Sequence, residues 1–534
     1  MSSTPRILRA LALLLCLCCG AVPVAHADLR GTVNALPEAD DAERRALLEA
    51  MVTSGDPAMA VVFDALGKGA LYLDRRSGEV VLGERRGARY LLTDIYSGEA
   101  LGEAGRRDVR RVAVDNALRE ELATLSAVGD LSAPDVATRL AAVEAITAAP
   151  SPLAIAALRG RLDKEPGHAV RDAIELGLAV ADLRSARGAA LEAALATVRG
   201  RSEPPVRAAL ADLGKRGDID PELREQAREL LARAEARLRW LARLEALFFG
   251  LSLGSVLLLS AVGLAITFGV MGVINMAHGE LIMLGAYTTW GLQQWLPGQP
   301  GLALLLSIPG AFVVSGAVGY ALERGVIRHL YGRPLETLLA TFGISLILQQ
   351  AVRTLISPLN RSVVTPAWLS GSWEVVPGLA LTWNRLAILV FALLLFAALL
   401  ALMRHTRLGL QVRAVAQNRA MARALGVRSA RVDALTFALG SGVAGVAGVA
   451  LSQLTNVGPN LGQAYIIDSF LVVVFGGVGN LWGTLVAAFT LGVANKLLEP
   501  AVGAVLAKIL LLVGLILFLQ RRPQGLFPRT GRQE

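Results

Sequence analysis

Three polar residues interrupt an apolar stretch of this 534-residue chain, and their side chains could hydrogen-bond a small solute. Residues 273–280 read VINMAHGE and contain Asn275, His278 and Glu280. Such groups are costly in lipid, so they usually face a cavity or the interior of a helix bundle. Gly279 permits a helix break, and transporters often unwind helices where the substrate passes. We predict that these residues line a solute pathway; the alternative is a short interfacial turn between two spans.

A second polar set recurs at a spacing of four residues. Thr341, Ser345 and Gln349 interrupt another apolar stretch. At that spacing they share one face of a helix. This face either lines the same pathway or joins two helices through hydrogen bonds.

A glycine-rich break forms the third candidate. Residues 475–483 read FGGVGNLWG and include Gly477 and Asn480 between two short apolar pieces. Irregular backbone at membrane depth is tolerated only where protein or water surrounds it. This pattern predicts a re-entrant hairpin beside the pathway, and a tight connecting turn is the alternative.

A basic segment at 404–431 carries seven arginines and separates two apolar regions. Residues 412–425 are rich in alanine and end at Gly426, which predicts one short helix. We interpret it as a docking helix for a cytosolic partner; the alternative is a face that binds lipid headgroups. The candidate coupling residues are Arg413, Ala416, Gln417, Asn418, Ala420, Ala422, Leu425 and Gly426.

The elements that position these residues are membrane spans. A hydrocarbon core of about 30 Å needs roughly 20 apolar residues per helix. Residues 246–522 therefore predict an all-α polytopic domain of about eight or nine transmembrane or re-entrant helices. The expected apolar segments are 247–270, 271–296, 301–323, 335–357, 384–403, 432–456, 463–478, 481–497 and 501–520.

Charge predicts the orientation of these spans. From residue 246 onward the chain has 19 Lys and Arg residues against 8 Asp and Glu residues, whereas residues 28–245 are net acidic. Fourteen of those 19 basic residues lie in 324–333, 404–431 and 521–534, which the positive-inside rule assigns to the cytoplasm. The tail 523–534 is then cytoplasmic. The basic charge is thus a property of membrane loops and does not indicate a nucleic-acid partner.

The N-terminus resembles a signal peptide over residues 1–27. Arg6 and Arg9 precede an apolar core, and AHA at 25–27 suits cleavage. An uncleaved anchor is the alternative. All three cysteines lie in this segment, so the mature chain is expected to have neither disulfides nor thiolate metal sites.

Residues 28–245 then form an expected periplasmic domain that is mostly helical. Strands are predicted at 71–74 and 79–84, and a further one at 91–96. Helices beginning near Val136, Val170 and Val206 recur at spacings of 34 and 36 residues. That period favours a short HEAT-like solenoid, and a plain helical bundle is the alternative.

Motifs for covalent chemistry are missing from the sequence. There is neither a G-x-x-x-x-G-K-[ST] nucleotide-binding loop nor an H-E-x-x-H zinc motif. The glycines at 440, 442 and 445 match the spacing of the G-x-G-x-x-G motif that binds dinucleotide cofactors. They lie in an apolar span without a preceding strand, so cofactor binding is not expected. Small residues at Gly440, Ala444 and Gly448 instead let neighbouring helices approach closely. We predict no catalytic residue, metal or cofactor in this chain.

Four stretches together resemble the permease subunits of ABC importers for branched-chain amino acids and urea. They are GVINMAHGELIMLGAY at 272–287, RPLETLLATFGISLIL at 333–348, TRLGLQVRAVAQNRAMARALGV at 406–427 and FGGVGNLWGT at 475–484. Their order and spacing are similar to the family over essentially all of 247–520.

The resemblance implies a subunit without enzymatic activity that pairs with a second permease in the bacterial inner membrane. Two separate ATPase subunits, which bind ATP and Mg²⁺, and a periplasmic binding protein would complete the importer. Residues 414–426 would contact an ATPase, although Gln417 and Asn418 stand where many importer loops carry an acid.

The long exported domain is more similar to urea-type permeases, so urea is the expected solute. A branched-chain amino acid or short amide is the alternative. A stand-alone channel or secondary transporter for a small neutral solute is the alternative from another class.

Overall fold

The computed structural model describes residues 29–54, 58–87, 89–112, 116–376 and 378–528. The predicted signal peptide and residues 529–534 of the tail lie outside these ranges. The chain divides into two compact units, Met1–Arg237 and Leu238–Glu534, and each is described by itself.

The first unit begins with helices and an antiparallel sheet. Its strands follow the order β4-β3-β2-β1-β5, which extends the predicted strands into a five-stranded sheet. The helices are α2 (Leu29–Ala35), α3 (Asp41–Ser54) and α4 (Ala58–Lys68), and the strands are β1 (Leu71–Asp74), β2 (Val80–Arg86), β3 (Arg89–Thr93), β4 (Ala100–Gly105) and β5 (Val109–Arg111).

Two turns of the same sequence pattern build this sheet. DRRSGE at 74–79 and DIYSGE at 94–99 each place a glycine at positive φ, Gly78 at 72° and Gly98 at 70°. In each turn the amide of that glycine donates to the carbonyl oxygen of the aspartate four residues earlier. Glycine adopts this backbone conformation without a Cβ clash. The repeated turn therefore explains the second hairpin, which the sequence interpretation did not include.

Helices complete the first unit. They are α5 (Asn116–Asp130), α6 (Val136–Ala148), α7 (Pro152–Leu162), α8 (His168–Ser185), α9 (Ala189–Thr197) and α10 (Pro204–Leu213), followed by the start of α11 (Pro221–Met271). Helices begin at or near each predicted repeat start. The sheet nevertheless makes the unit a mixed α and β structure, so a HEAT-like class remains a prediction for its helical part alone.

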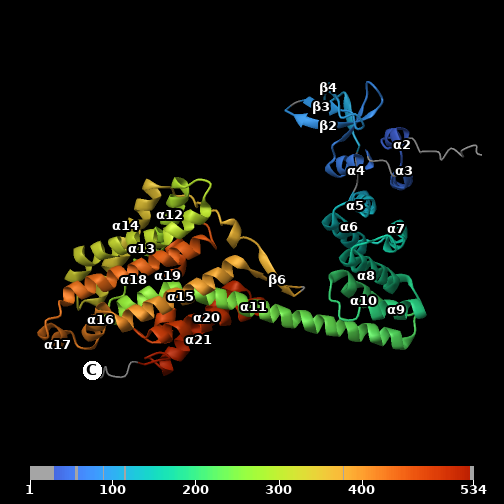
Figure 1. Ribbon diagram of the computed structural model, residues 1–534. Helices are drawn as coiled ribbons and strands as arrows, with labels where there is room; N and C mark the ends of the chain where they lie inside the picture. Colours follow the sequence, from blue (N-terminus) through green and yellow to red (C-terminus); the bar gives the residue numbers. More distant parts are fainter. Residues whose placement is uncertain (1–28, 55–57, 88, 113–115, 377, 529–534) are drawn as a thin grey trace, which may run out of the picture. The chain divides into compact units, whose positions relative to one another are not determined.

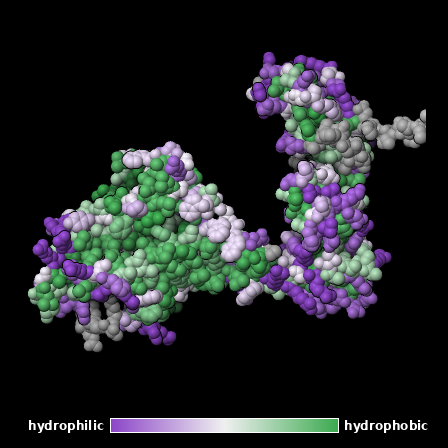
Figure 2. Space-filling model, in the orientation of Figure 1, coloured by the Kyte–Doolittle hydropathy of each residue, from purple (hydrophilic) through white to green (hydrophobic). Residues whose placement is uncertain are grey.

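The second unit is a helix bundle (Figure 1). It contains the rest of α11, then α12 (His278–Trp295), α13 (Pro300–Gly325), α14 (Pro334–Leu355), β6 (Ser372–Val376), β7 (Leu379–Thr382), α15 (Trp383–His405), α16 (Arg407–Gln417), α17 (Arg419–Ala424), α18 (Ser429–Ser452), α19 (Leu461–Gly476), α20 (Leu481–Val502) and α21 (Ala504–Arg521). Figure 2 shows hydrophobic residues over the visible outer face of this bundle.

Seven helices of the described chain are long and apolar enough to cross a membrane, whereas the sequence predicts eight or nine that are transmembrane or re-entrant. They are α11, α13, α14, α15, α18, α20 and α21. The difference arises at α19, which has only 16 residues, and at α12, whose 18 residues include several polar ones. The hairpin of β6 and β7 also departs from the all-α prediction.

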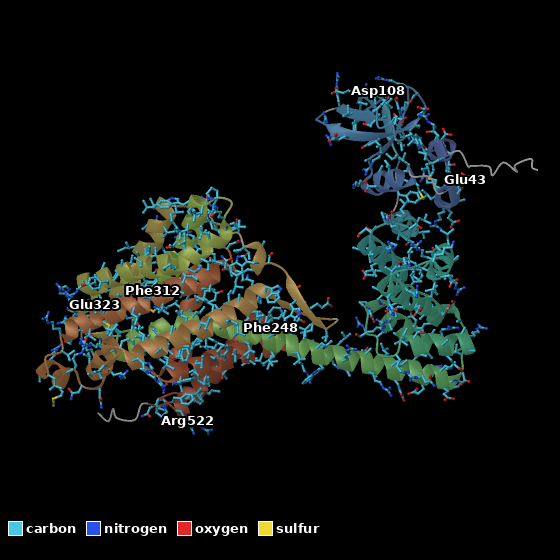
Figure 3. All side chains as sticks on the ribbon, viewed as in Figure 1. Glu43, Asp108, Phe248, Phe312, Glu323 and Arg522 are labelled. Carbon is cyan, nitrogen blue, oxygen red and sulfur yellow. The ribbon has the colours of Figure 1, made fainter. Side chains whose placement is uncertain are left out.

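Helix α18 lies at the centre of the bundle because glycines replace side chains where it crosses α12 and α13. A Cβ atom at Gly448 would lie 2.0 Å from the carbonyl oxygen of Ile282, and one at Gly445 would lie 2.5 Å from that of Ala311. Phe312, labelled in Figure 3, packs against Gly442 in the same way. The predicted close helix approach is confirmed at Gly448 and at Gly440, where a Cβ atom would lie 2.7 Å from the carbonyl oxygen of Gly263.

Candidate functional site

The polar stretch at 273–280 joins α11 to α12. Helix α11 ends at Met271, and Gly272 follows with a φ of 66°. The break therefore occurs at Gly272, and the prediction that Gly279 supplies it is wrong. Gly279 lies inside α12, where a Cβ atom would come within 2.7 Å of the carbonyl oxygen of Gly462. Its small size is needed for close packing on α19.

The stripe on α14 meets this stretch. The hydroxyl of Thr341 accepts a hydrogen bond from the amide of Met276 at 3.1 Å. Ser345 and Gln349 donate to the same oxygen of Glu280, at 2.9 and 2.7 Å. Two sets that the sequence indicated separately thus form one network between α12 and α14.

Two atoms of this network keep unused hydrogen-bonding capacity. Glu280 Oε2 and Asn275 Nδ2 are buried without a partner among the described residues. An unpaired buried polar atom costs about 1–3 kcal/mol, so such atoms usually have a reason to persist. Asn275 also lines a cavity of about 130 Å³ whose other walls are Leu264, Ile274, Met276, Ile466, Ile467 and Phe470. Asn275 therefore borders a small, mostly apolar space.

His278 is fully buried and binds the backbone of α11. Its Nε2 lies 2.8 Å from the carbonyl oxygen of Ser260, to which it donates. It does not line the cavity beside Asn275. His278 therefore connects α12 to α11.

The glycine-rich segment forms a tight turn between α19 and α20. Gly477 has a φ of 101° and Gly479 one of 75°. The side chain of Asn480 accepts a hydrogen bond from the amide of Gly483 at 3.2 Å and caps α20. Because α20 is a full-length helix of 22 residues, the expected short piece at 481–497 and its re-entrant hairpin are not found.

The basic segment contains two helices, and the expected single helix over 412–425 is wrong. Asn418 divides α16 from α17, because its side chain accepts from the amide of Met421 at 2.9 Å and caps α17. Gly426 ends α17 with a φ of 85°, as its type predicts. We call residues 407–426 the docking segment.

One face of the docking segment is buried and the other is exposed. Ala422 is buried with Val412, Val415 and Val432, so it is not available to a partner. Ala416 is half-buried, whereas Arg413, Gln417, Asn418 and Ala420 are exposed. The large apolar residues on the outside are Leu410, Met421 and Leu425, which are 61%, 58% and 78% exposed. The sequence interpretation included only Leu425 of these three, since it did not know which helix face was buried.

An ion pair that was not predicted from the sequence holds this segment against α18. The guanidinium of Arg419 donates to both carboxylate oxygens of Asp433 on α18, at 2.7 and 3.0 Å, and Asp433 is 1% exposed. Arg419 also lies 4.9 Å from the ring centre of Tyr331. Burial alone would lower the pKa of Arg419, but its hydrogen bonds to Asp433 outweigh burial and raise it. Burial and the Asp433 charge raise the pKa of the Tyr331 phenol.

A further buried carboxylate lies on α13. Glu323, labelled in Figure 3, is 1% exposed, and neither of its oxygens has a hydrogen-bond partner among the described residues. Arg324 Nε is 4.0 Å away. An acid near the end of an apolar span is the sequence signal that could have identified it. In the described part of the chain, no group of three or more His, Cys, Asp or Glu residues is placed to hold a metal ion.

Comparisons with known proteins match the second unit. Residues 246–519 match the family described as branched-chain amino acid transport system / permease component. The high-affinity branched-chain amino acid transport system permease protein LivH of Escherichia coli K12 is 31% identical over 296 residues, 54% of this chain and 96% of LivH. BraD of Pseudomonas aeruginosa is 32% identical over 297 residues, again 54% of this chain and 96% of the relative.

A more distant relative is LivM of Escherichia coli K12, another permease protein of the high-affinity branched-chain system. It is 25% identical over 313 residues, which cover 53% of this chain and 70% of LivM. No solved structure matches the chain.

The matched region contains the α11–α12 break, the α14 stripe and the docking segment. With its seven apolar helices, the chain is a multi-pass protein of the inner membrane, and its relatives are transport subunits rather than enzymes. Because the family match spans the membrane unit and two relatives are covered almost end to end, this chain belongs to the branched-chain amino acid transport system permease family.

Proposed function

We propose that the chain is a permease subunit of an ATP-driven ABC importer. The observation that carries this proposal is the docking segment, which exposes Leu410, Met421 and Leu425 outside the apolar helices. Its opposite face packs on α15 and α18, and Arg419 is fastened to Asp433. A partner that moves this segment would therefore move two spans with it.

The remaining partners follow from this role. The relatives include both LivH and LivM, permease proteins of one named system, which supports a second permease beside this chain. Two ATP-binding subunits would bind ATP and Mg²⁺, and a periplasmic binding protein would deliver the solute. In this proposal the N-terminal domain, residues 28–245, is exported by the signal peptide and helps to seat the binding protein. The C-terminus is cytoplasmic.

Exposed apolar residues on the docking segment give a direct test. Met421→Ser together with Leu425→Ser should weaken binding of the ATP-binding subunits about tenfold or more, because central apolar contacts carry much of an interface's energy. The measurement is co-purification from membranes and substrate-stimulated ATP hydrolysis. Leu359→Ser with Val364→Ser is the matched control, since these residues are 71% and 62% exposed on the loop after α14. Normal ATP hydrolysis in the docking variant would contradict the proposal.

A branched-chain amino acid is the solute that the comparisons and the cavity support best. The cavity beside Asn275 has aliphatic and aromatic walls that suit an aliphatic side chain. The free amide of Asn275 could donate to a solute carboxylate, and the free oxygen of Glu280 could accept from an ammonium group. The earlier preference for urea has no support from the named relatives.

Urea remains a second candidate for one reason. The relatives are covered over 96% of their length by only 54% of this chain, so the N-terminal unit lies outside the matched region. An additional exported domain is the feature that favours urea.

Uptake by the complete importer in proteoliposomes would decide between the solutes. We expect ATP-dependent accumulation of labelled leucine, with unlabelled urea in excess failing to compete. The reverse pattern would assign urea. Uptake by this chain alone, insensitive to vanadate, would instead support a stand-alone channel or secondary transporter.

A further inference from the structure

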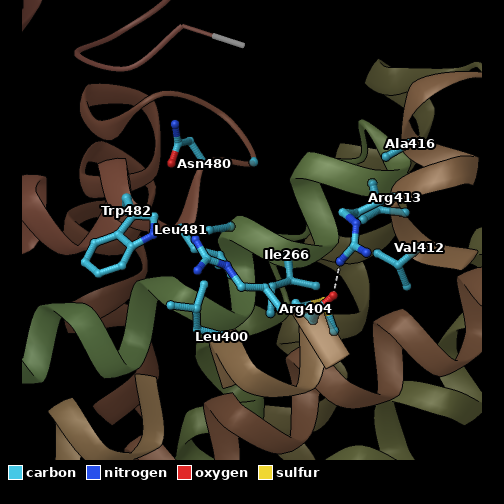
Figure 4. A pocket seen from close by; sticks show the side chains of 13 residues that line it. Ile266, Leu400, Arg404, Val412, Arg413, Ala416, Asn480, Leu481 and Trp482 are labelled. Carbon is cyan, nitrogen blue, oxygen red and sulfur yellow. Dashed lines mark hydrogen bonds between the residues drawn. The ribbon is translucent and has the colours of Figure 1, made fainter. Parts of the chain in front are cut away.

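A second cavity of about 260 Å³ lies where the docking segment meets the spans (Figure 4). Four helices and one turn contribute to it: α11, the end of α15, α16, the start of α20 and the α19–α20 turn. The lining residues include Ile266, Leu400, Arg404, Arg413 and Trp482. The solute pathway candidates at Asn275 and Glu280 are not among them.

The charge of this cavity is wholly positive. Arg404 and Arg413 are its charged lining residues, and no carboxylate lines it. Arg413 donates one hydrogen bond to the backbone carbonyl of Met403, which leaves most of its N–H groups available. The side chain of Arg404 has no hydrogen bond or ion pair within the part of the chain that the structure describes. Guanidinium groups with spare donors bind anions such as phosphate.

The rest of the wall is apolar and belongs to membrane helices. Ile266 lies on α11 and Leu400 on α15, both within apolar spans. Trp482 is 47% exposed at the start of α20. Tryptophan favours the depth of lipid headgroups, and arginine near the end of a span reaches the same depth. The cavity therefore combines two arginines with an apolar wall at the end of the spans.

We propose that this cavity binds an anionic phospholipid, with its phosphate between Arg404 and Arg413 and an acyl chain along Ile266 and Leu400. A free phosphate would satisfy the guanidinium groups but would leave the apolar wall uncovered, so the lipid fits better. The bound lipid touches α15, α16 and the α19–α20 turn together. It would therefore hold the docking segment against the spans and make the transport unit sensitive to membrane composition.

Native mass spectrometry of the full-length chain in detergent tests this proposal. The probes are phosphatidylglycerol, phosphatidylcholine and inorganic phosphate. We expect one phosphatidylglycerol molecule to remain bound in preference to phosphatidylcholine. Arg404→Gln with Arg413→Gln should weaken its binding about thirtyfold, since each basic residue near a lipid surface contributes about 1 kcal/mol.

Matched variants separate this site from general attraction to a basic loop. Arg428→Gln with Arg431→Gln removes the same charge from exposed positions outside the cavity and should retain the bound lipid. Arg404→Lys with Arg413→Lys should restore most of the preference. Equal loss in the two glutamine variants, or no preference in the wild-type chain, would overturn the proposal. Displacement by millimolar inorganic phosphate would overturn the lipid assignment and identify a small-anion site.

Discussion

Glu280 and Asp433 are both buried carboxylates at 1% exposure, yet their hydrogen-bond partners differ. Glu280 receives two hydrogen bonds from neutral side chains on one oxygen, and its other oxygen is free. Asp433 has both oxygens bound by the guanidinium of Arg419. The first carboxylate keeps an acceptor for a visiting N–H group, whereas the second has both oxygens engaged.

The difference follows from what each carboxylate joins. Asp433 connects α18 to the docking segment, where a full charge pair resists separation because breaking it leaves a buried charge. Glu280 connects α12 to α14, where weaker neutral bonds allow an exchange of partners. A transporter needs both kinds of contact: one that transmits movement and one that a solute can replace.

The largest effect is expected at the Arg419–Asp433 ion pair. Asp433→Asn should destabilise the membrane unit by up to about 3 kcal/mol, because it leaves Arg419 partly buried beside a neutral amide. Thermal unfolding in detergent measures this change. Removing both charges in Arg419→Gln with Asp433→Asn should recover part of the loss. A single variant as stable as the wild type would show that the ion pair does not brace the docking segment.

A smaller and more specific effect is expected at Glu280. Glu280→Gln keeps the shape of the side chain but replaces its carboxylate with a neutral amide. A solute N–H group then loses a hydrogen bond to a charged acceptor, which contributes about 1.5 kcal/mol or more. We expect KM for uptake to rise about tenfold, with only a small change in thermal stability.

Ser345→Ala is the control for the Glu280 experiment. It removes one donor to the occupied oxygen and leaves the free oxygen in place. KM should therefore change much less than in Glu280→Gln. Equal changes in KM for the two variants would mean that Glu280 only joins helices.

The spans and the polar residues around Glu280 were largely predictable from the sequence. Apolar stretches marked α11, α13, α15 and α18 because hydrocarbon thickness sets their length, and intramembrane polarity marked Asn275, Glu280 and the α14 stripe. That these sets meet was not predictable, since it depends on how α12 packs against α14. The contact of Asp433 was not predictable either, because it also depends on helix packing. Its partner Arg419 lies 14 residues earlier on another helix.

Errors in the prediction arose where a local pattern had two structural meanings. The glycines at 477 and 479 suited either a re-entrant hairpin or a turn, and the length of α20 decides for the turn. Asn418 was counted as a docking residue, although its side chain caps α17 and divides the expected helix. Capping residues and exposed polar residues have the same types, so sequence alone does not separate them.

The smallest effect is expected at Asp218 in the first unit. This residue pairs with arginine as Asp433 does, but it is exposed to solvent. Its carboxylate accepts from Arg216 at 2.9 Å and pairs with Arg187 at 2.8 Å while remaining 42% exposed. Hydrogen bonds from Arg216 hold the pKa of Asp218 well below its usual range. The stabilisation is therefore fully present above the unfolded pKa of about 3.9 and is lost as the pH falls below it.

Asp218→Asn should lower the melting temperature of the first unit slightly at pH 7, and this difference should shrink as the pH falls below about 4. A loss at pH 7 as large as that of Asp433→Asn would show that burial does not distinguish the two pairs.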